Sequence, residues 1–287
     1  MIKWRGIEEI TPTRAEELLK HNTSNRKMRL AKVRTYAILM KNGMWKADSN
    51  GAILISENGE VVNGQHRLQA VIEAGIPVAM EVRYGVDKDI YKVLDQGANR
   101  SVGDYMDAFP YKFSITSCAR TMVAVKRGET LTSALHGQMA GNAAVPNDWV
   151  IEEINTNFDL YQRVAQSAYK FRNTVQYLQT SAFMAAVMVA IYVGKGNEVF
   201  EFLEDLTSPA PVSNSATLLR DHIMRRKLSG KITTKKDTTA LVLLAYEKYL
   251  SGDSVNVMRS DAAMRVFAEY EMMLRMKFEE RNGGDYK

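Results

Sequence analysis

The stretch VVNGQHRLQAVIEAG, residues 61–75, decides how the first part of this 287-residue chain is expected to fold. Its β-branched start, Val61-Val62, predicts a short strand, which Asn63-Gly64 interrupts. A helix is expected over residues 66–74, with Gly75 ending it. His66 and Arg67 therefore occupy the first helical turn, where the helix dipole already makes the surroundings positive.

The segments around this stretch predict a small mixed α/β domain. Strands are expected at 7–11, 52–56, 60–62 and 78–85, with an Asn58-Gly59 hairpin turn before the third. Helices are expected at 13–21, 27–43 and near 87–94. Thr13 and Glu16 form a capping-box pattern at the start of the first helix. The second helix carries apolar residues at helical spacing, namely Leu30, Val33, Ala37 and Met40.

Strand signals fade after about residue 105, and the rest of the chain has helical spacing. Its most apolar run, residues 181–193, is shorter than the roughly 18 residues of a spanning helix, so it predicts a buried core helix and no membrane partner. The expected fold class is α+β, with a mixed α/β domain over residues 1–104 and an α-helical domain over residues 105–287.

The positive charge of the chain is concentrated in segments. The net charge is +5, and residues 20–46 contain eight Lys or Arg and no Asp or Glu. Such a segment favours a polyanionic neighbour, although a solvated helix face is the alternative. Cys118 is the single cysteine, which excludes a disulfide within the chain and fits a reducing setting. With no secretory h-region at the N-terminus, a cytoplasmic location is expected.

The residues at the start of the 66–74 helix suit an anion. Backbone N–H groups at a helix N-terminus bind phosphate, and a preceding glycine allows close approach. Arg67 can grip phosphate oxygens, and His66 can donate a hydrogen bond or move a proton. The alternatives are that both side chains face solvent, or that His66 bonds a backbone carbonyl of the hairpin.

VVNGQHRLQAV, with a hairpin before it and a strand after it, resembles the G-x-H-R signature of the ParB/sulfiredoxin superfamily. The resemblance covers residues 7–84 and implies a ParB/sulfiredoxin-like nucleotide-binding domain. Family members include sulfiredoxins, a free-serine kinase, CTP-dependent chromosome-partition proteins and a DNA-binding regulator with a D-G-Q-H-R version. Here Asn63 replaces that aspartate. Gln65 stands where sulfiredoxins need cysteine, so sulfinic-acid repair is excluded.

The resemblance implies a nucleotide site whose members are Gly64, Gln65, His66 and Arg67, with Asn25 and Arg26 as a second anion-contacting box. His66 and Arg67 would act in catalysis. Asp95 would hold Mg²⁺ or act as a base, and Arg100 would complete the phosphate pocket. A polar loop at 22–26 and a capped turn at 95–105 are the alternatives. Glu8, Glu9 and Glu16 are further carboxylate candidates.

Two basic segments are candidates for nucleic-acid binding. Arg29 and Lys32 belong to the first, and Arg225, Arg226, Lys227 and Lys231 belong to the second, which has six cations in residues 225–236. The alternative for the second is that cations at a helix C-terminus offset the dipole. The histidines are scattered and there is one cysteine, so no zinc cluster is expected.

These features together lead to two expectations. The first is a protein that binds ATP or CTP, with Mg²⁺, and hydrolyses it or transfers its phosphate, in phage or mobile-element DNA biology. The second is a sequence-tolerant DNA-binding protein of the partition or regulator type, with DNA cleavage as a weaker option. The sequence does not decide between a monomer and an oligomer.

Overall fold

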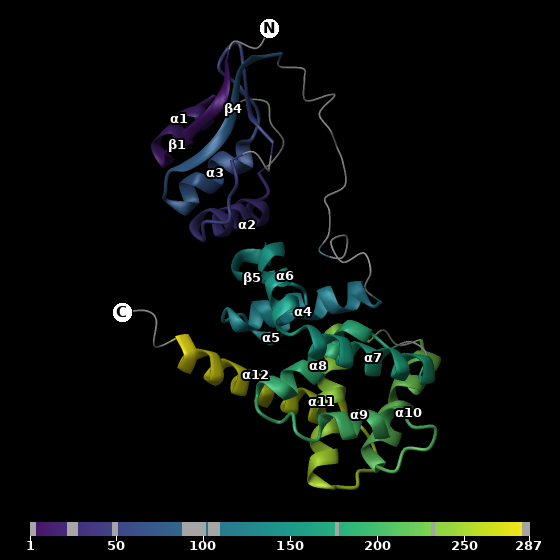
Figure 1. Cartoon of the computed structure of the whole chain (residues 1–287). Coiled ribbons are helices and arrows are strands. Elements are labelled where there is room, and N and C mark those ends of the chain that lie inside the picture. The colour runs from purple at the N-terminus through teal and green to yellow at the C-terminus, as the bar shows by residue number, and fades with distance from the viewer. Residues whose placement is uncertain are drawn as a thin grey trace. The chain divides into compact units, whose positions relative to one another are not determined.

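The computed structural model describes residues 4–21, 28–47, 51–87, 102, 110–175, 178–230 and 233–282. Contacts divide the chain into two units, Met1–Arg100 with Ala140–Pro146, and Ser101–Met139 with Asn147–Lys287. The first holds a mixed four-stranded sheet with helices, and the second is mainly helical (Figure 1). The α+β class expected from the sequence is confirmed.

The sheet of the first unit has the strand order β1-β4-β2-β3. Its strands are β1 (Trp4–Ile10), β2 (Ile53–Ser56), β3 (Val61–Asn63) and β4 (Val78–Val86). β1 pairs antiparallel with β4, and β2 pairs antiparallel with β3 through the expected hairpin. β2 runs parallel to β4, which requires a crossover connection. Helix α3 (Gln65–Ala74) lies in that connection.

Helices α1 (Pro12–Lys20), α2 (Leu30–Lys41) and α3 share one core with the sheet. Ile53 and Ile55 of β2 lie in this core. Leu54, between them, lies in a small separate cluster with Ala52 and Val86. Because successive side chains of a strand point to opposite faces, the helices cover the face that carries Ile53 and Ile55.

The first two helices begin at different residues from those expected. Thr11, not Thr13, caps α1, and its hydroxyl accepts a hydrogen bond from the Arg14 N–H at 3.1 Å. Pro12 then takes the first helical position, which suits its fixed φ and missing N–H. Leu30 is the first residue of α2 and is 58% exposed, so it does not join the core. The helix expected near 87–94 lies outside the described residues.

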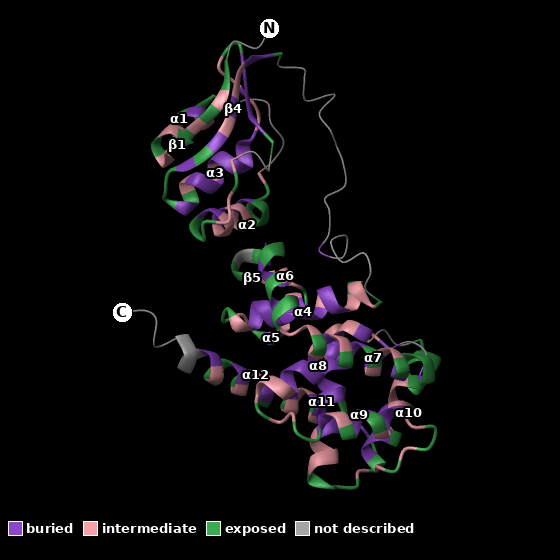
Figure 2. Ribbon diagram, viewed as in Figure 1, coloured by how far each residue is buried: buried purple, intermediate pink, exposed green. Residues whose placement is uncertain are grey.

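The second unit is built from α-helices and includes the short strand β5 (Gln138–Met139), whereas the short strand β6 (Ala143–Ala144) belongs to the 140–146 segment of the first unit. The sequence did not reveal either strand. The helices of the second unit are α4 (Lys112–Lys126), α5 (Leu131–Ala134), α6 (Asn147–Thr156), α7 (Phe158–Thr174), α8 (Thr180–Tyr192), α9 (Val199–Thr207), α10 (Asn214–Leu228), α11 (Lys235–Ser251) and α12 (Ser260–Asn282). Buried residues run along α8 and α11 (Figure 2). The expectation that residues 181–193 form a core helix is confirmed by α8.

A buried carboxylate ties four of these helices together. Glu153 of α6 accepts hydrogen bonds from Lys126 Nζ of α4 at 2.6 Å, Tyr161 OH of α7 at 3.1 Å and Tyr192 OH of α8 at 3.0 Å. A buried charge is tolerated when it is paired and hydrogen-bonded in this way. Across the part of the chain that the structure describes, no helix is both long and apolar enough to cross a membrane.

Candidate anion-binding site at the start of helix α3

Gly64 joins β3 to α3 in a conformation that suits only glycine. Its φ is 112°, in the left-handed region. A Cβ at this position would lie 3.0 Å from Ile53 Cγ1 and 3.3 Å from Ile53 Cα. Glycine is therefore required for the turn and for the close approach of β2. The sequence suggested that this glycine admits a ligand, whereas the structure shows that it admits the neighbouring strand.

Helix α3 begins at Gln65, directly after its N-cap residue Gly64, and the side chains of its first turn are buried. Gln65, His66 and Arg67 are all buried. The Gly64 carbonyl accepts hydrogen bonds from the N–H groups of Arg67 and Leu68, at 2.8 and 3.0 Å. Gly64 has no side chain with which to cap the helix. The N-cap residue of α3 therefore contributes no hydroxyl or carboxylate of its own to the helix start.

His66 connects the start of α3 to the start of α2. Its Nε2 accepts a hydrogen bond from the backbone N–H of Arg29 at 3.0 Å. A backbone N–H can only donate, so Nε2 carries no proton and the imidazole is neutral with its proton on Nδ1. The alternatives from the sequence were a solvent-facing side chain or a bond to a hairpin carbonyl, and this bond to an amide is neither.

This hydrogen bond brings two helix N-termini together. Arg29 is the N-cap residue of α2, and its side chain makes no capping hydrogen bond. Gly64 is the N-cap residue of α3. Each helix start carries a partial positive charge of about half an elementary charge, so their potentials add where they meet. An anion is the ligand that this arrangement stabilises.

Arg67 turns away from the helix axis and holds the segment before β2. Its guanidinium donates to the carbonyl oxygen of Gly51, and Nη2 donates to that of Ala52 at 3.1 Å. The side chain is buried, and this burial lowers the pKa of Arg67. A negative charge bound nearby would offset that cost of burial. Arg67 thus positions the 51–52 segment and contributes positive potential from within the core.

Arg29 and Lys32 carry exposed cationic side chains at the start of α2. Lys32 Nζ lies 5.4 Å from the centre of the Tyr36 ring, one turn further along the helix. The sequence predicted these two residues as nucleic-acid contacts. Because the Arg29 amide contacts His66, the structure places Arg29 beside the α3 start, and this brings the two predicted groups of residues together.

Several predicted site residues lie outside the described residues. They are Asn25 and Arg26 of the second anion box, Asp95 and Arg100 of the 95–105 segment, and Lys231 of the second basic segment. The Mg²⁺ role given to Asp95 therefore stays a prediction. Within the described ranges, no cluster of three or more His, Cys, Asp or Glu side chains is placed to hold a metal ion.

Of the three early glutamates, Glu8 of β1 accepts hydrogen bonds from side chains of β4 and α1. It accepts a hydrogen bond from Tyr84 OH at 2.7 Å and one from Arg14 Nε at 3.5 Å. Burial, followed by the bond to Glu8, raises the pKa of Tyr84. Glu9 and Glu16 are exposed. These contacts give Glu8 a role in joining β1, α1 and β4.

The basic residues at the end of α10 lie among acidic side chains. Arg225 contacts Asp221 at 3.7 Å, and Arg226 contacts Asp237 of α11 at 3.8 Å. Arg225 and Arg226 line a cavity of about 300 Å³ together with Asp221 and His222. Lys227 is exposed in the same last turn. This surface is of mixed charge, and the cations also offset the helix dipole, as the alternative reading of the sequence expected.

No family model matches the chain, and neither a curated protein nor a solved structure matches it. The resemblance to the ParB/sulfiredoxin superfamily consequently rests on the G-x-H-R residues and the order of elements around them.

Proposed function

We propose that the first unit binds the phosphate groups of a nucleoside triphosphate where the starts of α2 and α3 meet. The observation that carries this proposal is the 3.0 Å hydrogen bond from the Arg29 N–H to His66 Nε2. This bond holds two helix N-termini side by side, and neither N-cap residue caps its helix with its own side chain. A polyphosphate carries several negative oxygens, so it can be shared between two such ends.

The charged side chains around these helix starts support the same ligand. Arg29 and Lys32 extend into solvent, where they attract an anion and contact its outer oxygens. Arg67 adds its charge from inside the core. Backbone amides fixed by the fold bind phosphate without reorganisation, which is the usual form of electrostatic preorganisation in phosphoryl chemistry.

The resemblance to ParB/sulfiredoxin proteins extends the proposal to ATP or CTP with Mg²⁺, and to hydrolysis or transfer of the terminal phosphate. Phosphoryl transfer depends mainly on positioning and charge stabilisation, so a cationic helix start is a sufficient protein framework. In the present geometry His66 positions Arg29. It would move a proton only after releasing that amide.

Nucleotide binding is tested by thermal unfolding with ATP, ADP, CTP and GTP, each with and without Mg²⁺. A ligand at 100 times its Kd stabilises the folded state by about 2.7 kcal/mol. Arg29→Gln should reduce that stabilisation, because it removes a charge at the α2 start and leaves the backbone N–H in place. Lys41→Gln is the matched control, since it removes a charge from the far end of the same helix.

The result that would contradict binding at this site is an equal loss of stabilisation in both variants, or no stabilisation of the parent protein by any of the nucleotides. Turnover is tested separately with His66→Gln, whose amide oxygen can still accept from the Arg29 N–H. If His66 only positions Arg29, this variant should retain most of the NTP hydrolysis. If His66 moves a proton, hydrolysis should be lost.

DNA binding is the second candidate function, and the exposed cations at the end of α10 favour it. Removing Lys227 should then weaken binding evenly across DNA sequences and flatten the salt dependence by about one unit of slope. Unchanged affinity and slope in Lys227→Gln would remove this surface from consideration and leave the α2 start as the region to test.

A further inference from the structure

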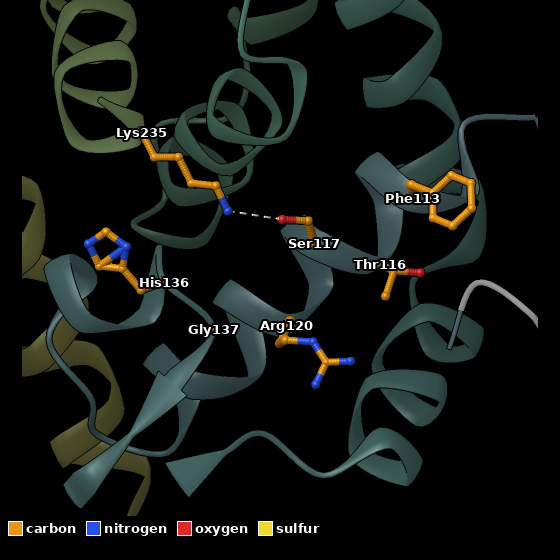
Figure 3. Close-up of a pocket in the computed structure, with 7 residues that line it drawn as sticks. All are labelled: Phe113, Thr116, Ser117, Arg120, His136, Gly137 and Lys235. Atoms are coloured by element: carbon orange, nitrogen blue, oxygen red, sulfur yellow. Dashed lines mark hydrogen bonds between the residues drawn. The ribbon is translucent and has the colours of Figure 1, made fainter. Parts of the chain in front are cut away.

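A cavity of about 190 Å³ in the second unit gathers basic and hydroxyl side chains. Its polar and charged lining residues are Thr116, Ser117, Arg120, His136 and Lys235, and Phe113 and Gly137 complete it (Figure 3). They come from α4, from the turn after α5 and from the start of α11. None of the described residues that line this cavity is acidic.

Lys235 is the central cation of this cavity. It extends from α11 toward Ser117 of α4, as Figure 3 shows. Among the described residues, Lys235 Nζ has two partners, the Ser117 hydroxyl at 3.4 Å and the Leu135 carbonyl at 3.2 Å. Both partners are neutral. Lys235 is also the first residue of α11, so its charge lies at the positive end of a helix dipole, where an anion would be stabilising.

Arg120 adds positive charge to the same cavity, and His136 adds ring nitrogens that can hydrogen-bond an anion. Arg120 Nη2 donates to Asn147 Oδ1 at 3.0 Å, and partial burial lowers the pKa of this arginine. His136 is exposed at the cavity edge. The stem of Arg120 lies against Gly137, where an added Cβ would approach Arg120 Cδ to 2.9 Å and where φ is 68°. Glycine at 137 thus permits Arg120 to lie along the cavity wall.

We propose that this cavity, which we call the α4–α11 pocket, binds the phosphate of a nucleotide unit, with Phe113 offering its ring to the base. A cavity of about 190 Å³ is smaller than the 300–1,000 Å³ of typical small-molecule sites. It therefore accommodates a phosphate group and leaves the rest of the ligand outside. The Phe113 side chain lines the same cavity and is 68% exposed, and exposed aromatic rings beside cations are the surfaces on which bases stack.

The ligand chemistry has two sources, a free mononucleotide and a single-stranded nucleic acid. The probes are inorganic phosphate, dTMP and a single-stranded dT oligonucleotide, each titrated into the full chain. Binding is followed by the amide NMR signals of Ser117 and Gly137, which report on the α4–α11 pocket and not on the α3 start. The result is therefore independent of the function proposed for the first unit.

Two variants change the pocket, Lys235→Gln by removing a charge and His136→Gln by removing the imidazole ring, and one matched variant removes a charge nearby. Lys235→Gln and His136→Gln should each weaken binding of all three probes, about tenfold or more for the lysine, because a hydrogen bond to a charged group is lost. Lys236→Gln is the control, because Lys236 is the next residue of α11 and lies 5.1 Å from the Phe267 ring, outside the pocket lining. It should leave binding within about twofold.

Phe113→Ala distinguishes the base contact from the phosphate contact. This variant should weaken the binding of dTMP and of the oligonucleotide, and it should leave the binding of inorganic phosphate unchanged. Similar affinities for dTMP and the oligonucleotide indicate a mononucleotide ligand, whereas much tighter binding of the oligonucleotide indicates a strand.

The proposal is overturned if Lys236→Gln weakens binding as much as Lys235→Gln, or if no probe moves the Ser117 and Gly137 signals at millimolar concentration. Because His136 is exposed, its variant keeps the test valid should Lys235→Gln fail to fold.

Discussion

The starts of helices α3 and α11 both place basic residues where the helix dipole is positive, yet they are built differently. At α11, Thr234 and Asp237 form a capping box, with Thr234 Oγ1 accepting from the Asp237 N–H at 3.1 Å and Asp237 Oδ2 accepting from the Thr234 N–H at 3.0 Å. At α3, Gly64 supplies no cap, and the His66 side chain reaches across to the α2 amide.

The two helix starts would bind an anion through different groups. A capped helix start has its own acceptor for its first amides, so the anion proposed for the α4–α11 pocket would be bound mainly through side chains, namely those of Lys235, Arg120 and His136. The N-cap residue of α3 is a glycine and offers no such acceptor, so in the proposed site the backbone would be the principal donor there. The anion affinity of a backbone site should depend on the geometry of the turn, and that of a side-chain site should depend on the charge of its residues.

The largest expected effect that follows from this comparison is at Gly64. Gly64→Ala should destabilise the first unit by about 3 kcal/mol, because the new Cβ meets Ile53 and a non-glycine residue is strained at this φ. Gly59→Ala is the control, since Gly59 also has positive φ but has no atom within 4 Å of its Cβ position. It should cost only about 1 kcal/mol. Urea unfolding measures both, and equal costs would contradict the tight packing against β2.

A smaller effect is expected from removing the α11 cap. Thr234→Ala should destabilise the second unit by about 1 kcal/mol, because the Asp237 N–H loses its acceptor. Thr234→Ser keeps the hydroxyl and should be close to the parent protein. Urea unfolding again gives the comparison. ATP binding at the α3 start should be unchanged in both variants, and a loss of ATP affinity in Thr234→Ala would show that the two helix starts do not act separately.

The smallest effect is expected at the ion pair beside this cap. Arg226→Gln removes a 3.8 Å contact with the capping Asp237. Partly exposed ion pairs contribute little, so the change in unfolding free energy should be below about 1 kcal/mol and should shrink as salt is added. A loss as large as that of Thr234→Ala would mean that the arginine, and not the threonine hydroxyl, fixes the start of α11.

The protonation of His222, near the end of α10, gives a pH-dependent test of the same region. Burial, with the nearby Arg226 charge, lowers the pKa of His222. The unfolded chain therefore binds this proton more readily than the folded chain, so the contribution of His222 to stability is complete above its unfolded pKa of about 6.5 and is lost as pH falls below it. His222→Gln should flatten the pH dependence of unfolding between neutral and mildly acidic pH. An unchanged profile would contradict this assignment.

Several elements of both units followed from local signals. Asn58-Gly59 predicted the hairpin, Gly75 predicted the end of α3, and the apolar run at 181–193 predicted the buried helix α8. The α1 cap was placed two residues late because a Thr–Glu pattern at 13–16 resembled a capping box, while Pro12 fixed the true start. The parallel pairing of β2 with β4 depends on long-range contacts, which periodicity does not report.

The sequence indicated which residues occupy the start of α3, but not what they contact. The motif indicated Gly64, His66 and Arg67, yet the partners of these residues, which are the Arg29 amide and the Gly51 and Ala52 carbonyls, are backbone groups and leave no trace in residue types. The α4–α11 pocket was not predicted at all. Its basic side chains are spread over more than a hundred residues, from Arg120 to Lys235, and only the packing of the helices brings them together.

The most direct measurement is an amide NMR titration of the isotope-labelled protein with ATP and CTP, with and without Mg²⁺. If the joint start of α2 and α3 is the phosphate site, the amide signals of Gln65, His66 and Arg29 should shift most, and with the same saturation curve. Shifts confined to other parts of the chain at saturating nucleotide, with these three signals unmoved, would contradict the proposed site.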